Sequence, residues 1–378
     1  MRALAMRDDL IDLLSKLVSI DSVNPSLVPG GAGEAEIAAF IADWARAADL
    51  EAELLVETPG RPSVLVRARG NAGGKTLLLC GHIDTVNVEG MTDPHTPRIE
   101  GDRLYGRGAY DMKGGVAAAL IACREARGLG LAGDVVVAAV ADEEHASLGV
   151  QEALRAVRAD AAVVTEPTEL EIAVAHKGFV WAEIEVTGRA AHGSRPHLGI
   201  DAIVKAGPLL TAIGELDRAL SEREHPLVGR GSVHASVISG GVEMSSYPAR
   251  CKIGLERRTI PGETAAQVEA ELDALVDRCR APDPELVAEL RMGLVREPFE
   301  VDQSEGIVAA LAAAAGDERP IGGASYWADS AFISAAGIPT VLFGPGGEGA
   351  HAQVEWVSID DTETVARTLV EVASAVCR

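Results

Sequence analysis

The sequence TLLLCGHIDTV at residues 76–86 indicates the fold class and the position of a site. The run 76–80 is continuously apolar, as expected of a strand that is buried on both faces of a parallel sheet. His82 and Asp84 follow this strand directly. In open α/β sheets, binding sites form beyond the carboxyl ends of the strands. The stretch therefore predicts a central strand and one part of a functional site.

Short apolar strands and helices alternate on both sides of this stretch. The expected strands are 63–68, 75–80, 134–140, 161–165 and 339–343. The expected helices are 9–20, 34–48, 114–127, 150–157, 305–315 and 362–376. This alternation predicts an α/β open sheet.

A different pattern begins near residue 179. Residues 179–187, FVWAEIEVT, alternate apolar and polar side chains, which is typical of a half-exposed antiparallel strand. Helices at 201–220 and 263–279 and strands at 232–239 and 250–257 are expected to follow. Along the chain this gives the order strand, helix, strand, strand, helix, which is typical of a two-layer α+β sandwich. We predict an α/β protein whose open mixed-sheet domain, residues 1–178 and 295–378, is interrupted by an inserted α+β sandwich domain at 179–294.

The composition argues against several classes of protein. The 378 residues include 34 Lys and Arg against 57 Asp and Glu, a net charge of −23, so neither nucleic acid nor an anionic membrane is an expected partner. The five cysteines show no Cys-x-x-Cys spacing, which argues against disulfides and a cysteine-bound zinc ion. The opening residues MRALAMRDDL lack the apolar core of a secretion signal, and no apolar run reaches the ~20 residues of a membrane span. We therefore expect a cytoplasmic protein.

Acidic and histidine side chains follow the predicted buried strands. They are His82 and Asp84 after 75–80, Glu143 and Glu144 after 134–140, Glu166 after 161–165 and His351 after 339–343, with Asp111 just before the helix 114–127. A bound cation would relieve the repulsion between so many carboxylates in one cleft. Imidazole and carboxylate ligands without thiolate suit Zn²⁺, Mn²⁺ or Co²⁺. The set exceeds what one tetrahedral ion needs, and two ions bridged by one carboxylate would form a hydrolytic site.

Each of these residues also has a simpler interpretation. Asp111 could be a helix cap, and Glu143 and Glu144 could belong to a solvated first helical turn. Glu166 could lie in a surface turn, and His351 in an ordinary loop. The hypothesis of a metal site therefore depends on their joint occurrence at successive strand ends.

Five segments also carry a family resemblance. They are GHIDTV at 81–86, GRGAYDMKGG at 106–115, DEE at 142–144, TEPT at 165–168 and GAH at 349–351. In this order they resemble the co-catalytic zinc aminoacylase and carboxypeptidase family, which includes acetylornithine deacetylase, succinyl-diaminopimelate desuccinylase, aminoacylase and glutamate carboxypeptidase. The resemblance extends over nearly the whole chain. It implies that residues 1–178 and 295–378 form the catalytic domain and that the inserted domain at 179–294 serves as a lid and in dimerisation.

The resemblance implies two divalent metal ions, with zinc favoured and cobalt or manganese as alternatives. By their positions in the motifs, His82 and Glu166 would bind one ion, Glu144 and His351 would bind the other, and Asp111 would bridge the two.

The resemblance implies other roles for Asp84 and Glu143. Asp84 resembles the residue that orients the His82 ring. Glu143 resembles the general base, which takes a proton from the metal-bridging water and returns it to the departing amine.

Four further residues are implied to contact the substrate. His192, in the segment AHGS, would reach across a homodimer to polarise the scissile carbonyl group. Arg258, in the segment ERRTIPGE, would clamp a substrate carboxylate, and Gly346 and Gly347 would bring backbone N–H groups to the same carboxylate. Without the resemblance, His192 is interpreted as an exposed loop residue and Arg258 as the partner of Glu256.

The favoured function is that of a two-metal amidohydrolase that deacylates N-acyl amino acids, closest in motif style to acetylornithine deacetylase. A dipeptidase or glutamate-type metallocarboxypeptidase is the alternative enzyme, and a catalytically silent relative that binds amino-acid derivatives is the alternative of another class. The segment SSYP at 245–248 stands where several relatives have Asn-x-x-Pro, which weakens a desuccinylase assignment. Tyr326 and Trp327 would either shape a substrate pocket or belong to the core, and His145 is expected on a helix surface.

Overall fold

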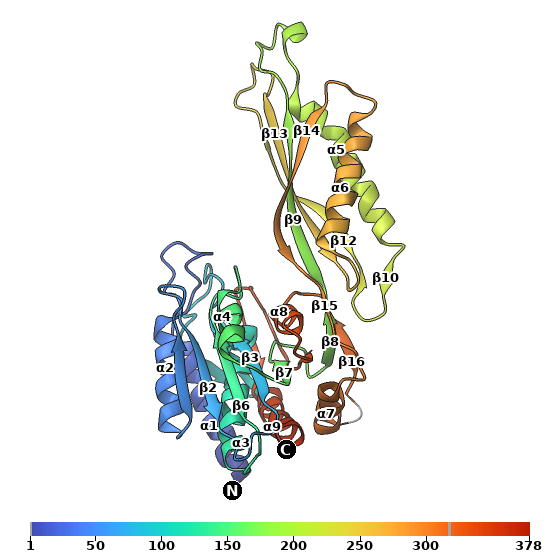
Figure 1. Cartoon of the computed structure of the whole chain (residues 1–378). Coiled ribbons are helices and arrows are strands. Elements are labelled where there is room, and N and C mark those ends of the chain that lie inside the picture. Colours follow the sequence, from blue (N-terminus) through green and yellow to red (C-terminus); the bar gives the residue numbers. More distant parts are fainter. Residues whose placement is uncertain (1, 317–318) are drawn as a thin grey trace. The chain divides into compact units, whose positions relative to one another are not determined.

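The computed structural model describes residues 2–316 and 319–378, which form two compact units (Figure 1). Of the described residues, the first unit takes 2–174, 301–316, 319–322 and 328–378, and the second takes Ala175–Glu300 and Gly323–Trp327. The sequence places an inserted domain at 179–294. The short segment Gly323–Trp327 also belongs to the second unit, which the sequence does not predict because this segment lies outside 179–294.

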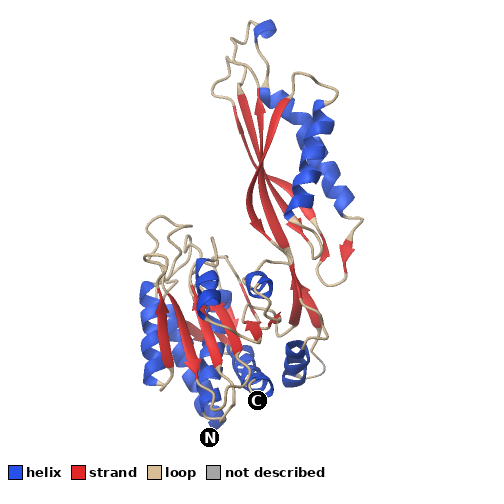
Figure 2. Cartoon of the chain, in the orientation of Figure 1, coloured by secondary structure: helices blue, strands red, loops and turns tan. Residues whose placement is uncertain are grey.

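The first unit is an α/β structure built on a mixed sheet (Figure 2). Its helices are α1 (Arg2–Ser19), α2 (Ala35–Ala47), α3 (Gly114–Arg127), α4 (Leu148–Ala156), α7 (Gly306–Ala315), α8 (Ser330–Ala335) and α9 (Ile359–Val376). The main strands are β1 (Glu51–Leu55), β2 (Ser63–Ala68), β3 (Leu77–His82), β6 (Val135–Val140), β7 (Ala161–Val164), β8 (Ile172–His176) and β17 (Thr340–Leu342).

The order of the main strands is β1-β2-β6-β3-β7-β17-β8. At β8 the chain passes into the second unit, and β15 (Phe299–Glu300) and β16 (Ile321–Ala324) pair with this strand. A smaller sheet of the first unit has the order β18-β19-β5-β4, formed by β4 (Arg98–Glu100), β5 (Arg103–Tyr105), β18 (Gly347–Glu348) and β19 (Trp356–Ser358).

The neighbouring strands β6, β3, β7 and β17 run parallel. Every residue of β3 and β6 is buried, as the continuous apolar runs predict. Each such Val or Leu side chain stabilises the fold by about 1.5–3 kcal/mol relative to an exposed one. Because the four strands are parallel, their carboxyl ends meet at one edge of the sheet.

The crossovers through α3 and α4 run in opposite directions along the sheet, so right-handed connections place these helices on opposite faces.

The second unit is a two-layer sandwich. Its antiparallel sheet has the order β12-β13-β9-β14, with β9 (Gly178–Thr187), β12 (Ser232–Gly240), β13 (Arg250–Thr259) and β14 (Val287–Arg296). The helices α5 (Ala202–Leu220) and α6 (Ala265–Arg280) lie side by side on one face of this sheet (Figure 1). A short hairpin of β10 (Glu224–His225) and β11 (Gly229–Arg230) follows α5.

Side-chain caps define where the two helices of the sandwich begin. Asp201 accepts hydrogen bonds from two backbone N–H groups of the first turn of α5. Thr264 and Gln267 form a reciprocal capping box at the start of α6. The apolar stripe of α6, including Leu272 and Leu275, packs into the core beneath the sheet.

The predicted fold class is confirmed, because the structure combines a mixed α/β sheet with a separate antiparallel sheet. The helix expected at 114–127 has those bounds in α3. The strand expected to end at residue 80 instead extends to His82. Among the described residues, no helix is long and apolar enough to cross a membrane.

Candidate metal centre

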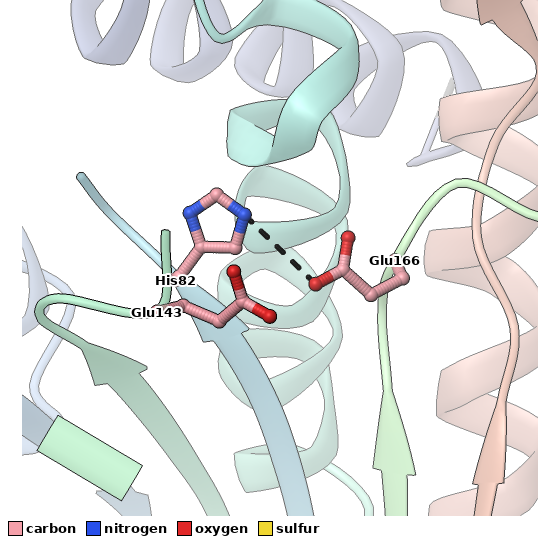
Figure 3. A group of neighbouring side chains, drawn as sticks. All are labelled: His82, Glu143 and Glu166. Atoms are coloured by element: carbon pink, nitrogen blue, oxygen red, sulfur yellow. Dashed lines mark ion pairs between the residues drawn. The ribbon is translucent and has the colours of Figure 1, made fainter. Parts of the chain in front are cut away.

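The parallel strands bring three predicted site residues to the same edge of the sheet. His82 is the last residue of β3, Glu143 follows the end of β6, and Glu166 follows the end of β7. Because β3 lies between the other two strands, the three side chains converge, as Figure 3 shows. A ring nitrogen of His82 and one carboxylate oxygen from each glutamate all lie within 4.8 Å of one another. The distance between Nε2 of His82 and Oε1 of Glu166 is 3.9 Å.

Asp111 lies between the two predicted histidines. It belongs to the turn Ala109–Lys113, which leads directly into α3. Its Oδ1 is 3.1 Å from Nε2 of His82, and its Oδ2 is 3.3 Å from Nε2 of His351. Each carboxylate oxygen thus faces a different imidazole, which is the arrangement that a bridging ligand requires.

His351 and Glu144 form the second half of the cluster. Nε2 of His351 lies 3.2 Å from the Glu144 carboxylate. His82, Asp111 and Glu144 also form a group of potential ligand atoms within 4.8 Å of one another. The side chain of His351 remains 56% exposed, whereas that of His82 is 1% exposed. The cluster is therefore buried on the His82 side and accessible on the His351 side.

The electrostatics of the cluster favour a bound cation. Burial raises the pKa of Glu143 and of Glu166 well above the usual range, because a desolvated carboxylate resists ionisation. Burial opposes protonation of His82, but its hydrogen bond to Asp111 and the neighbouring carboxylates outweigh this and raise its pKa. Hydrogen bonds to Asp111 and Glu144 raise the pKa of His351 to about 10.

The clustered carboxylates therefore need positive charge close by. The donors of the cluster are imidazole nitrogens and carboxylate oxygens, which suit Zn²⁺, Co²⁺ or Mn²⁺, and such an ion would supply that charge. The residues present thus fit a site for divalent ions.

Asp84 contacts the cluster through both its main chain and its side chain. The ring nitrogen Nδ1 of His82 lies 3.0 Å from the backbone carbonyl oxygen of Asp84 and 3.7 Å from its carboxylate. The carboxylate instead accepts hydrogen bonds from the backbone N–H groups of Glu143, at 3.1 Å, and Glu144, at 3.3 Å. Asp84 therefore links the ends of β3 and β6, with its main chain at the histidine and its side chain at the two glutamates.

A buried polar network that sequence analysis did not find supports Asp84. The Asn24 side chain donates hydrogen bonds to Asp84, at 2.7 Å, and to Asp142, at 3.0 Å. Arg61 forms ion pairs with Asp142, at 2.7 Å, and with Glu34, at 2.6 Å. Asp142 has a φ of 68°, in the left-handed region, and immediately precedes Glu143. No local sequence signal marks these contacts, because the partners lie far apart along the chain.

Replacing Arg61 with Met is expected to destabilise the protein by about 3–5 kcal/mol, because Glu34 and Asp142 would stay buried without their cation. The change in the free energy of unfolding can be measured by urea denaturation. Arg69→Met is the matched control, because Arg69 pairs with Glu51 at the surface, where the side chain of Arg69 is 60% exposed. Equal stability of the two variants would contradict the assigned importance of the buried network.

The predicted substrate residues of the inserted region lie in the second unit. His192 is exposed, and its Nδ1 lies 2.8 Å from the hydroxyl of Ser194. Arg258 lies in β13, where its Nε donates to Glu256 at 2.8 Å and its guanidinium group lies over the Phe179 ring.

The two glycines predicted at the substrate carboxylate have other hydrogen-bond partners. The N–H of Gly346 donates to Asp361 at 3.2 Å, and that of Gly347 donates to Glu169 at 3.3 Å. Both donors therefore already bind carboxylates of the chain itself, and a substrate carboxylate would have to displace Asp361 and Glu169 to reach them.

Two further residues named in the sequence analysis are Trp327 and His145. Trp327 is partly exposed, donates its indole N–H to the carbonyl of Glu297 and packs edge-on against Phe179. His145 is exposed, but it lies in the turn between β6 and α4 rather than on a helix.

Comparison with known proteins gives consistent matches. A model of peptidase family M20/M25/M40 matches residues 78–375. Acetylornithine deacetylase of Proteus mirabilis is 29% identical over an alignment of 378 positions, which covers 96% of each chain. Among solved structures, a tripeptidase of Staphylococcus aureus has a TM-score of 0.81 at 19% identity, over 98% of this chain and 99% of the other. A dinuclear metal-binding peptidase of Bacillus subtilis has a TM-score of 0.76 at 17% identity, over 99% of both chains. The structural matches show a shared fold.

Proposed function

Because this chain belongs to peptidase family M20/M25/M40 and is therefore a metallohydrolase of amide or peptide bonds, we propose that it deacylates N-acyl amino acids. The observation that carries this choice is the similarity to an acetylornithine deacetylase along 96% of both chains. The substrate would have an acylated amino group and a free carboxylate, and the products would be an amino acid and a carboxylic acid.

We place two divalent ions, zinc by preference, at the cluster. One would be held by His82 and Glu166 and the other by Glu144 and His351, with Asp111 shared between them. The contacts of Asp111 with both imidazoles support this division of the ligands. When bound, such ions polarise the amide carbonyl group and lower the pKa of a water molecule.

Glu143 is the proposed general base. It adjoins Glu144, and its carboxylate lies among the candidate ligand atoms of His82 and Glu166. It would accept a proton from the attacking water as the water oxygen bonds to the acyl carbon. It would then deliver that proton to the departing amine nitrogen as the C–N bond breaks. The hydrogen bond from the backbone N–H of Glu143 to the Asp84 carboxylate would hold the main chain of Glu143 in place during both steps.

The deacylase proposal can be tested with a panel of N-acetyl amino acids, N-succinyl amino acids and dipeptides, assayed by release of the free amine. Faster turnover of N-acetyl amino acids is the expected result. A preference for dipeptides, or for substrates with C-terminal glutamate, would instead support the alternative peptidase activity. No turnover of the panel by protein that has both ions bound would support a silent binding relative.

Arg258 is proposed to clamp the substrate carboxylate. Replacing it with Ala is expected to raise KM by about tenfold or more with a smaller effect on kcat, because a charge-assisted hydrogen bond is typically worth about 1.5–3 kcal/mol. Steady-state kinetics on an N-acyl amino acid and on its methyl ester check this. The ester already lacks the carboxylate, so its KM should not respond to the substitution; an equal change for both substrates would argue against the clamp.

The proposed biological unit is a homodimer, assembled through the second unit. β12 is an edge strand of the sandwich, and residues 234–240 along it are exposed. Val237 and Ile238 on this strand are 65% and 51% exposed. An unpaired edge with exposed apolar side chains can pair with another strand, and a second copy of this chain is the proposed occupant.

The dimer proposal also places His192 of one protomer at the site of its partner, which a mixed dimer can test. His192→Ala and Glu143→Gln homodimers should each be nearly inactive. A heterodimer of the two, purified through two different affinity tags, would retain one complete site and should have about half of the wild-type activity. An inactive heterodimer, or a monomeric wild-type protein in light scattering, would rule out this arrangement.

A further inference from the structure

A buried glutamate that lies outside the predicted ligand set holds the turn that carries Asp111. Glu355 is buried, with 1% of the residue exposed. Its Oε1 accepts hydrogen bonds from the backbone N–H groups of Tyr110, at 3.0 Å, and Asp111, at 3.1 Å. Its Oε2 accepts one from the N–H of Gly108, at 3.0 Å. Three N–H groups of one turn thus converge on a single anion, as in an anion-binding nest.

The fourth partner of Glu355 connects this turn to other segments. Nη1 of Arg107 donates to Glu355 at 2.6 Å, and the guanidinium group is almost completely buried. Its remaining nitrogens donate to the carbonyl oxygens of Asn87, at 3.0 Å, and Ala352, at 2.9 Å. A planar guanidinium group can hold three acceptors in fixed directions, which a lysine cannot do.

These contacts join the three segments that carry the two histidines and the shared aspartate. Asn87 lies in the loop that follows His82 and β3, and Ala352 is the neighbour of His351. The backbone N–H of Gly106 also donates to the carbonyl oxygen of Glu355, at 3.2 Å. Any displacement of the turn relative to His351 would have to break several charge-assisted hydrogen bonds at once.

We propose that Glu355, paired with Arg107, is a positioning residue that holds Asp111 at a fixed position between His82 and His351, so that both metal ions can be bound at once. This inference rests on the proposed two-ion site. Glu355 itself contacts neither imidazole in the structure, and it acts through the main chain of Asp111 and through the segment that it shares with His351.

Glu355→Gln is the direct test. The amide retains the shape of the side chain but loses the charge, and its NH₂ group would face backbone donors. We expect the affinity for the second equivalent of Co²⁺ to fall by about 10–100-fold, which is typical for loss of an outer-shell partner, with a smaller effect on the first equivalent. Equilibrium dialysis of metal-stripped protein against Co²⁺ measures both binding steps.

A matched control separates positioning from general stabilisation. Glu152 is also a buried carboxylate of the first unit, and it accepts hydrogen bonds from the N–H and hydroxyl groups of Thr58, outside the cluster. Glu152→Gln should alter the urea midpoint of the metal-free protein but leave both Co²⁺ affinities unchanged. If Glu355→Gln does not fold, Arg107→Lys, which keeps the charge but not the three-way contact, should weaken the same binding step.

The outcomes distinguish this inference from the function on which it rests. Wild-type protein that binds fewer than two ions would overturn the two-ion site itself. If the wild type binds two ions and Glu355→Gln binds them with unchanged affinities, only the proposed role of Glu355 is overturned. If Glu355→Gln is unfolded, unchanged affinities in Arg107→Lys have the same meaning.

Discussion

Replacing Glu143 with Gln is expected to reduce kcat/KM by at least ~10²-fold, and by up to ~10⁴-fold, while both metal ions stay bound. The amide has nearly the same shape as the carboxylate but cannot accept the proton of the attacking water. The backbone N–H of residue 143 would still donate to Asp84, so the loop at the end of β6 should keep its conformation. The loss should therefore be chemical rather than structural.

Two measurements on purified protein check this expectation. Metal content by atomic emission should equal that of the wild type, and amine release from an N-acyl amino acid should be nearly abolished. Glu143→Asp is the informative control, because it retains a carboxylate that is one methylene group shorter and should lose less activity. Full activity of Glu143→Gln would remove Glu143 as the base, and loss of metal would show that it acts as a ligand.

Asp111→Asn is expected to have an effect of similar size on activity, but through loss of metal. The carboxylate faces His82 with one oxygen and His351 with the other. An asparagine would offer one carbonyl oxygen and one NH₂ group, which cannot bind a cation. The affinity for at least one ion should therefore fall by more than ~10–100-fold, which is the typical loss when only an outer-shell partner is removed.

Thermal stability gives a second measurement for Asp111→Asn. At a free metal concentration of ~1000 times Kd, binding stabilises a folded protein by about 4 kcal/mol. Zinc should consequently raise the Tm of the wild type much more than that of Asp111→Asn. The matched control is Asp160→Asn, because Asp160 accepts a hydrogen bond from the N–H of Thr76 at the opposite end of β3. An equal response of Asp111→Asn and the wild type to zinc would argue against a bridging role.

The central strands could be predicted from sequence because burial on both faces requires an uninterrupted apolar run, as in β3 and β6. Their parallel order then explains why candidate ligands at separate strand ends lie together. The short edge strand β1 was not predicted, since its sequence EAELL is mostly exposed and carries a weak apolar pattern.

The polar contacts around the site could not be predicted in the same way. Arg61 lies 27 residues from Glu34, and Arg107 lies 248 residues from Glu355, so neither ion pair has a local spacing that would reveal it. Gly346 shows a related limit. Glycine allows a close approach to its N–H group, but only the three-dimensional structure shows that Asp361 accepts that hydrogen bond.

The candidate ligands come from positions between 82 and 351 of a chain of 378 residues. During synthesis on the ribosome, His82, Asp111, Glu143, Glu144 and Glu166 emerge long before His351. A nascent chain can therefore assemble at most part of this cluster until residue 351 has been translated.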